Sequence, residues 1–307
     1  MTIRLRIGTR GSPLALAQTT ATRDALAAAH GWPAEALEIV AIKTTGDAIT
    51  DRPLGEAGGK GLFTKELDQA MIEGRIDLAV HSAKDLPTRL PDALCIAGYM
   101  AREDVRDALI SAKATRIADL PQGGRVGTAS LRRAAQVKRL RPDLETVLLR
   151  GNVETRLRKA ESGELDATLL ALAGLKRLGL AHRATALLPI TEFLPAVGQG
   201  AVAITARADD AAARDAVAKI ACRETELALI AERAFLTVLD GSCRTPIAGH
   251  AQLRDGRLSF EGMVLRIDGS EIFAGADAGS DNDAASIGAR VGEDILQRLP
   301  PGLLASH

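Results

Sequence analysis

The sequence is poor in aromatic residues and cysteines, and it has no long apolar run. Aromatic residues make up 2% of its 307 residues, so a core has to be built from Ala, Leu, Val and Ile. No segment approaches the ~18 consecutive apolar residues of a membrane span, and the N-terminal residues lack a signal-peptide core. Cys95, Cys222 and Cys243 show neither metal-ligand nor disulfide-framework spacing. We therefore expect a cytoplasmic protein with no membrane segment and no metal site.

Charge and glycine motifs restrict the ligands further. The formal net charge is zero, with 39 basic and 39 acidic residues, which argues against a general nucleic-acid binder. No predicted strand is followed by G-x-x-x-x-G-K-S/T or G-x-G-x-x-G, so the common phosphate-binding and dinucleotide-binding loops are excluded. The remaining composition, 46% hydrophobic and 25% charged, is that of a globular protein with two or three domains.

Two stretches of the chain repeat each other. Residues 6–12 and 125–130 both read as an apolar strand, a Gly-Thr turn and a serine that can cap a helix. Residues 74–86 align with residues 163–175 in the same order. Where the first copy has His81, Ser82, Lys84 and Asp85, the second has Leu170, Ala171, Ala173 and Gly174. This pattern predicts a duplicated α/β unit, with chemistry in the first copy and mainly binding in the second.

Hydrophobic periodicity predicts two α/β regions and a third region of different texture. Strands are expected at residues 5–8, 37–43, 77–80, 125–127, 146–149 and 167–170, and helices at residues 12–30, 64–73, 130–141 and 153–162. Such alternation is typical of parallel sheets with helices on both faces. A strand at residues 201–205 is expected to return to the first sheet. Beyond Cys222, a helix at 225–239, three strands with two Asp-Gly turns and a helix at 284–299 predict a small α+β domain.

The segment Thr44–Gly61 is predicted to be a loop. It contains five glycines and a proline and shows little periodicity. A loop of this length inside a compact domain is usually functional or mobile. We expect it to act as a lid over a cleft, with Lys60 and Phe63 at its end.

Arginines gather where strands are predicted to end and helices to begin. They are Arg10, Arg132, Arg133, Arg150, Arg156 and Arg177. A helix N-terminus already favours anions, so further cations there indicate that an anion occupies the site. Each desolvated guanidinium–carboxylate contact contributes about 1.5–3 kcal/mol. The set predicts a pocket for several carboxylates or phosphates.

Two other residues are candidates for chemistry, each with a plainer alternative. Asp85 is the acid at the strand end of the first copy, and it is either a turn cap or a carboxylate that handles protons or stabilises a cation. His81 could be a base, although a single strand-end histidine is more often structural. Cys243, beside Arg244 in a Gly-Ser turn, is either inert, a covalent attachment point or a nucleophile.

Motifs along nearly the whole chain match one family. They lie at residues 9–16, 58–63, 79–87, 102–107, 127–133, 149–156, 173–179, 194–200 and 241–243. Together they resemble the porphobilinogen deaminase family, also called hydroxymethylbilane synthase. Gly11 and Ser242 depart from the familiar pattern without removing a charged group.

The resemblance implies a transferase of tetrapyrrole (haem) biosynthesis. Four porphobilinogen units would be condensed, with loss of ammonia, onto a dipyrromethane cofactor held by a thioether to Cys243. Hydrolysis would then release hydroxymethylbilane. Asp85 would face the pyrrole nitrogens and stabilise the azafulvene cation. A small-molecule substrate, no nucleic acid, no membrane and a monomer are the implied partners and state.

The resemblance also implies roles for the remaining polar residues. The cofactor would be bound by Ser82, Lys84, Thr128, Ser130, Arg132 and Arg133. The substrate and growing chain would be bound by Arg10, Ser12, Arg150, Arg156, Arg177 and Gln199.

The implied fold is α/β, with two periplasmic-binding-protein-like doubly wound domains and a small α+β C-terminal domain. The expected ranges are 1–100 with 200–218, then 105–194, then 222–307. Domains 1 and 2 would form the cleft, and domain 3 would present Cys243. Two other classes stay open on the residues alone. A non-catalytic receptor for a small carboxylate needs neither Cys243 nor Asp85, and a thiol-dependent acyl transferase needs a histidine such as His250 near Cys243.

Overall fold

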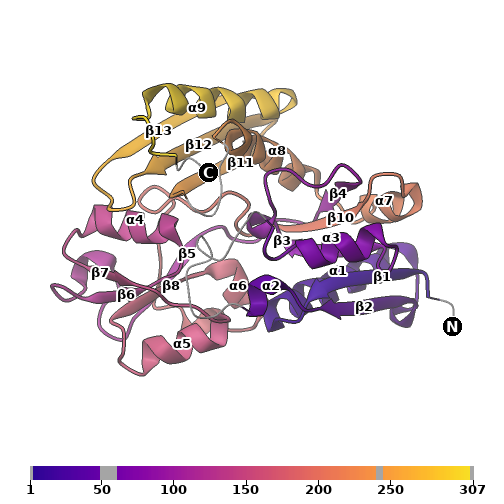
Figure 1. The fold of residues 1–307 in the computed structure, drawn as a ribbon, viewed down its shortest axis with the longest axis horizontal. Helices are drawn as coiled ribbons and strands as arrows, with labels where there is room; N and C mark the ends of the chain where they lie inside the picture. Colours follow the sequence, from indigo (N-terminus) through magenta and orange to yellow (C-terminus); the bar gives the residue numbers. More distant parts are fainter. Residues whose placement is uncertain (1–2, 49–60, 240–244, 305–307) are drawn as a thin grey trace. The chain divides into compact units, whose positions relative to one another are not determined.

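The computed structural model describes residues 3–48, 61–239 and 245–304. The chain divides into two compact units (Figure 1). The first unit comprises Met1–Thr50, Gly58–Glu103 and Gly200–Glu226, and the second includes Asp104–Gln199 and Leu227–His307. The predicted three-domain boundaries stay a prediction, since the C-terminal residues group with Asp104–Gln199. Within the described ranges, no helix is both long and apolar enough to cross a membrane.

The first unit is built on a five-stranded mixed sheet. The strand order is β2 (Leu37–Ile42), β1 (Leu5–Arg10), β3 (Leu78–Ser82), β10 (Val202–Arg207) and β4 (Leu94–Tyr99). The first three strands are parallel, and β10 runs antiparallel to both of its neighbours. The expected return of the chain to the first sheet is confirmed by β10, which lies between β3 and β4.

Helices cover both faces of this sheet because successive strand residues point to opposite sides. Leu78 and Val80 pack on the face that carries α1 (Pro13–His30) and α7 (Ala211–Ala218). Ala79, between them in sequence, packs with Leu67 and the rest of α3 (Lys65–Ile72) on the other face.

The second unit repeats this arrangement in its own five-stranded sheet. The strand order is β7 (Glu145–Val147), β6 (Arg125–Gly127), β8 (Ala167–Ala171), β5 (Asp107–Ile110) and β9 (Ala186–Leu187). Again three strands are parallel and the fourth is antiparallel to its neighbours. Helix α4 (Leu131–Leu140) covers one face, while α5 (Val153–Glu161) and α6 (Leu172–Arg177) cover the other. The duplication predicted from the sequence is confirmed by this common topology.

The C-terminal residues form an antiparallel sheet of β11 (Ile247–Arg254), β12 (Arg257–Leu265) and β13 (Ile272–Ser280). Helix α9 (Ala284–Arg298) packs on β12 and β13, and it crosses α8 (Arg223–Val238) closely at Gly288. A Cβ at Gly288 would collide with the carbonyl oxygen of Ala231, so this crossing needs a glycine. The predicted small α+β region and its two Asp-Gly turns are confirmed.

The structure differs from the sequence expectations at the start of the predicted loop and in several elements that were not predicted. The predicted loop Thr44–Gly61 begins with a short helix, α2 (Thr45–Ala48), because Gly46 N–H donates to Leu62 O and Thr45 N–H to Glu66. Strands β4, β5 and β9 and helices α6 and α7 were not expected. Of the loop, residues 49–60, including Lys60, lie outside the described residues.

Candidate active site

A pocket opens in the first unit where β1 and β3 end. Its polar lining comes from separate parts of the sequence and consists of Arg10, Ser12, Gln18, Thr64, His81, Ser82 and Asp85. Phe63 adds an aromatic wall. Strand β1 carries Arg10, the start of α1 carries Ser12, and the turn after β3 carries Asp85. This is the strand-end position at which α/β sheets bind ligands.

Arg10 connects the aromatic and acidic sides of the pocket. Its guanidinium carbon lies 4.0 Å from the centre of the Phe63 ring, a cation–π arrangement. One of its terminal nitrogens lies 3.8 Å from Oδ2 of Asp85. That separation is an ion pair too long for a hydrogen bond, and the Asp85 side chain keeps 33% of its surface exposed. Asp85 is thus a loosely paired carboxylate that solvent and ligands can reach.

The other polar residues hold the pocket wall in place. Ser12 caps α1 by accepting from Ala15 N–H at 3.3 Å, with Pro13 at the first helical position. Gln18 and Ser82 exchange hydrogen bonds of 3.0 and 3.2 Å between their side chains. Lys84 lies half-buried in the 3₁₀ turn Ala83–Asp85, next to Asp85 in sequence.

His81 lies in the interior of the sheet, although it reaches the pocket lining. Its Nε2 lies 3.1 Å from the Thr205 hydroxyl of β10. Burial, with a smaller contribution from the positive charge of Arg10, lowers the pKa of His81 to about 4. The imidazole is therefore neutral at pH 7.

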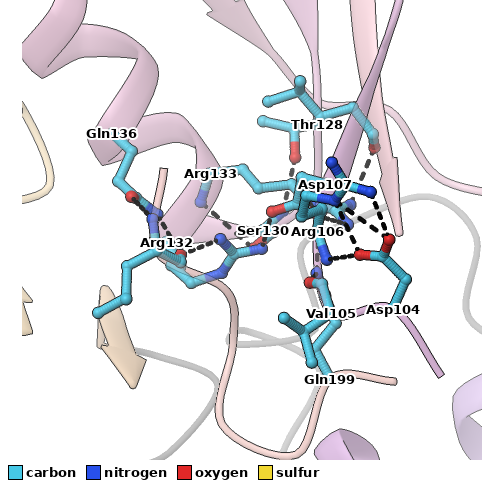
Figure 2. Close-up of polar contacts among 12 residues, drawn as sticks. Asp104, Val105, Arg106, Asp107, Thr128, Ser130, Arg132, Arg133, Gln136 and Gln199 are labelled. Atoms are coloured by element: carbon cyan, nitrogen blue, oxygen red, sulfur yellow. Dashed lines mark hydrogen bonds and ion pairs between the residues drawn. The ribbon is translucent and has the colours of Figure 1, made fainter. Parts of the chain in front are cut away.

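In the second unit, Arg132 and Arg133 share one buried carboxylate, that of Asp107 (Figure 2). Arg132 donates to Asp107 Oδ2 at 2.7 Å, and Arg133 donates to Oδ1 at 2.7 Å. The side chain of Asp107 is fully buried, and those of the two arginines are 5% and 6% exposed. Burial alone would raise the pKa of Asp107, but the two guanidinium groups hold it well below its usual range.

Amide side chains and backbone carbonyls complete this cluster. Gln199 donates to Asp107 Oδ1 at 2.9 Å and to Val105 O at 2.8 Å. The carbonyl of Leu194 accepts from Arg132 at 2.7 Å and from Gln136 at 3.0 Å. Within the described residues, Nε of Arg132 is the one atom of the cluster that is buried without a hydrogen-bond partner.

Thr128 and Ser130 build the turn into α4. The Thr128 hydroxyl accepts from Ser130 N–H at 3.1 Å, and Ser130 caps α4 by accepting from Arg133 N–H at 3.4 Å. The predicted cap at Ser130 is confirmed. Both arginines of the cluster therefore lie in the first turn of a capped helix.

The other three arginines predicted to bind carboxylates are half-buried and belong to the second unit: Arg150, Arg156 and Arg177. Arg150 follows β7, and Arg177 is the last residue of α6. Arg156, in the first turns of α5, donates from Nε to Gly151 O at 2.8 Å. Their assignment to one carboxylate pocket stays a prediction. Cys243, the expected attachment point, lies outside the described residues.

Sequence reasoning missed Asp107 and Gln136 as members of the arginine cluster. Asp107 was visible as an acid at the start of a purely apolar run, Ala108–Ile110. A buried strand that begins with a carboxylate needs a cationic partner, which is the signal that could have identified it.

Comparison with known proteins places this arrangement in a family. A model described as "Porphobilinogen deaminase, dipyromethane cofactor binding domain" matches residues 5–215. A second, described as "Porphobilinogen deaminase, C-terminal domain", matches residues 226–297. The chain belongs to the porphobilinogen deaminase family. The resemblance inferred from the motifs is confirmed, and so is the dipyrromethane cofactor that the family's larger domain binds.

Individual relatives agree with this assignment. The porphobilinogen deaminases of Nitrobacter hamburgensis and Nitrobacter winogradskyi are each 56% identical over 292 residues, covering 95% of this chain and 92% of the relative. Among solved structures, a nutrient binding protein from Burkholderia cenocepacia bound to methionine is 14% identical, with a TM-score of 0.43. That similarity covers 72% of this chain and 93% of the other, and it concerns the fold alone.

Proposed function

We propose that the protein is a transferase that assembles a linear tetrapyrrole on a covalent primer. It would condense four porphobilinogen units onto the dipyrromethane cofactor with loss of ammonia, and then release hydroxymethylbilane by hydrolysis. The family match over residues 5–215, to a domain described by its dipyrromethane cofactor, is the observation that carries this proposal. A monomer in the cytoplasm is the proposed state.

The chemistry of the second-unit cluster suits a carboxylate-bearing cofactor. Two guanidinium groups face one carboxylate, so the buried cluster carries a formal charge of +1. The unpartnered Nε of Arg132 is a buried donor that lacks an acceptor among the described residues. A buried donor of this kind costs about 1–3 kcal/mol unless an acceptor reaches it. A cofactor carboxylate supplies both the missing charge and the missing acceptor.

Each site residue then has a proposed task. The cofactor, attached through the Cys243 thioether, supplies the nucleophilic pyrrole carbon on which the chain grows. Ser82, Lys84, Thr128, Ser130, Arg132 and Arg133 would hold it. Arg10, Ser12, Arg150, Arg156 and Arg177 would bind the carboxylates of the substrate and the growing chain. Gln199, expected among them, is buried and donates to Asp107 and Val105 O, so its proposed task is to support the cluster. Lys60 and Phe63 would belong to a lid segment.

Asp85 is the proposed catalytic residue. As ammonia leaves porphobilinogen, positive charge develops on the substrate ring and its nitrogen. A fixed carboxylate beside that charge stabilises it more in a partly dry pocket than water would. The 3.8 Å separation from Arg10 supports this role, because a tight ion pair would have neutralised the Asp85 carboxylate.

Intact mass spectrometry of the purified protein tests the proposal. We expect a stable excess mass of two pyrrole units, located by peptide mapping on Cys243. Cys243→Ala should remove the adduct and product formation, whereas the control Cys95→Ala should retain both. An unmodified protein that still forms hydroxymethylbilane, or an adduct on Cys95 or Cys222, would contradict it. A non-catalytic carboxylate receptor would carry no adduct at all.

A further inference from the structure

The arginine cluster of the second unit contains an acid that the proposed function does not use. Asp107 opens β5, and its carboxylate accepts from three side chains, those of Arg132, Arg133 and Gln199. Burying a carboxylate is costly unless it is paired, and here it is paired twice. An acid placed against the residues that should bind an anionic cofactor competes with that cofactor. Its presence therefore needs an explanation beyond packing.

Charge explains why the cluster tolerates this acid. Without Asp107, two buried guanidinium groups would stand together at the N-terminus of α4, where the helix dipole adds positive potential. With Asp107 the formal charge is +1 rather than +2. The carboxylate also engages both arginines from one side, with Oδ2 on Arg132 and Oδ1 on Arg133.

Geometry shows what is left for a ligand. Arg133 donates to Asp107 from its Nε and from one terminal nitrogen. Its other terminal nitrogen donates to Leu169 O at 2.9 Å. Arg132 is held by Leu194 O and Asp107, and its Nε stays without a partner among the described residues. The cluster thus retains one positive charge and one unmade buried hydrogen bond.

We propose that Asp107 is a positioning residue that sets the cofactor-binding cluster to accept one carboxylate group. It does so by holding Arg132 and Arg133 in fixed orientations and by cancelling one of their two charges. This inference rests on the proposed function for the identity of the ligand. The charge balance itself rests on the contacts alone.

The test uses the full chain and two variants. Asp107→Asn preserves shape but leaves two buried positive charges. Asp107→Asn combined with Arg133→Gln returns the cluster to a formal charge of +1. Asp166→Asn is the matched control, because Asp166 is another ion-paired acid at a strand start in this unit. It accepts from Arg125 N–H and pairs with Lys113, and it lies outside the cluster. Purified proteins are compared by intact mass and by melting in sodium acetate against sodium chloride at equal ionic strength.

We expect Asp107→Asn to carry at most about a tenth of the wild-type pyrrole adduct, since removing one partner of a buried pair is strongly unfavourable. Its melting temperature should rise with acetate and not with chloride, because acetate replaces the missing carboxylate. The double variant should regain part of the lost stability and lose the acetate effect, because its formal charge is again +1. Its adduct should stay low, because Arg133 is itself proposed to hold the cofactor. Asp166→Asn should show neither change.

Two results would overturn the proposal. One is an Asp107→Asn protein with a wild-type level of adduct and no response to acetate. The other is a double variant that is no more stable than Asp107→Asn, or whose melting temperature still rises with acetate. If wild-type protein carries no adduct, the proposed function fails, and the acetate response of Asp107→Asn still decides the charge balance.

Discussion

The two units use the same topology but treat their strand-end carboxylates in opposite ways. In the first unit, Asp85 follows β3, stays one-third exposed and meets Arg10 at 3.8 Å. In the second unit, Asp107 is fully buried and is bound by two arginines at 2.7 Å. One carboxylate is left available and the other is neutralised. The two acids are not counterparts, since Asp85 aligns with Gly174, so each unit places its own acid at this edge and surrounds it differently.

At the starts of the equivalent strands β3 and β8, both copies carry an aspartate that makes the same contact. Asp77 accepts from the backbone N–H of Arg6 at 2.8 Å, and Asp166 accepts from that of Arg125 at 2.6 Å. In each copy the acid precedes a central strand and ties it to the strand beside it. The two acids make the same contact in both copies, so we assign them to the scaffold.

The largest expected effect concerns Asp85. Asp85→Asn keeps the size of the side chain and removes its charge, so the substrate cation loses its fixed counter-charge. We expect a loss on the order of 10²-fold or more in the rate of ammonia release. Stability should change little, because partly exposed ion pairs contribute about 0–1 kcal/mol. Single-turnover ammonia release from fully primed enzyme measures the rate, and thermal melting measures stability.

The matched control for Asp85 is Asp77→Asn, which removes a scaffold acid from the same unit. It should lower stability and leave the rate per folded molecule near that of the wild type. If primed Asp85→Asn enzyme turned over at the normal rate, Asp85 would be a turn cap and another residue would have to supply the charge.

Local signals in the sequence predicted the elements that local chemistry determines. Helix α1 has its cap at Ser12, its proline at the first position and its end at Gly31, which adopts φ 63°. The strand at residues 125–127 was also predicted with its observed bounds. Capping, proline and glycine act within one turn of chain, so they can be read without knowing the fold.

Elements that depend on distant pairing could not be predicted in this way. Strand β9 is two residues long and exists through its pairing with β5. Strand β5 has an apolar run of three residues after Asp107, too short to show a period. The charges of Arg132 and Arg133 suggested a ligand anion, and the partner that the fold supplies lies about 25 residues away in sequence. An acid at the start of an apolar run indicates that a cationic partner is needed, but it does not indicate which cation the fold brings to it.

The next expected effect distinguishes His81 from Leu170, its counterpart in the second copy. Buried His81 stays neutral in the folded protein down to a pKa of about 4, while the unfolded chain takes up a proton near pH 6.5. Stability is therefore lost as the pH falls below about 6.5, by about 2 kcal/mol between pH 7 and pH 5. His81→Leu should remove most of that loss, as measured by denaturant unfolding at both values.

The reciprocal change checks whether the strand position itself confers acid sensitivity. Leu170→His places an imidazole at the equivalent buried position of β8, and it should steepen the loss of stability below pH 6.5. If His81→Leu lost as much stability below pH 6.5 as the wild type does, another group would be responsible for that loss.

A smaller effect is expected at the aromatic wall of the first-unit pocket. Arg10→Lys keeps the charge but loses the planar guanidinium that lies 4.0 Å from the ring centre of Phe63. We expect KM for porphobilinogen to rise about tenfold with a smaller change in kcat. Arg23→Lys, on the exposed side of α1, is the matched control. Phe63→Leu should raise KM as well, and the double variant should show less than the sum of the two effects.

The last expected effect is at Asp68 of α3, the helix that corresponds to α5 of the second unit. Asp68 is a buried acid, and α5 has no buried acid among its described residues. Burial, reinforced by the charge of Glu66 and opposed by a hydrogen bond from Thr64, raises the pKa of Asp68 to about 6.

The folded protein thus retains a proton that the unfolded chain releases near pH 4, so this group costs stability as the pH rises from 4 through 6. Asp68→Asn removes that cost, because the amide carries no charge in the folded or the unfolded chain. We expect the gain to be about 2 kcal/mol larger at pH 8 than at pH 4, because each unit by which the pKa is raised costs about 1.4 kcal/mol once the pH exceeds both values. Denaturant unfolding at the two pH values measures the difference, with Asp24→Asn on the exposed face of α1 as the control. A gain of equal size at both values would show that the amide acts through packing or hydrogen bonding, and that the first unit carries no such charge penalty in α3.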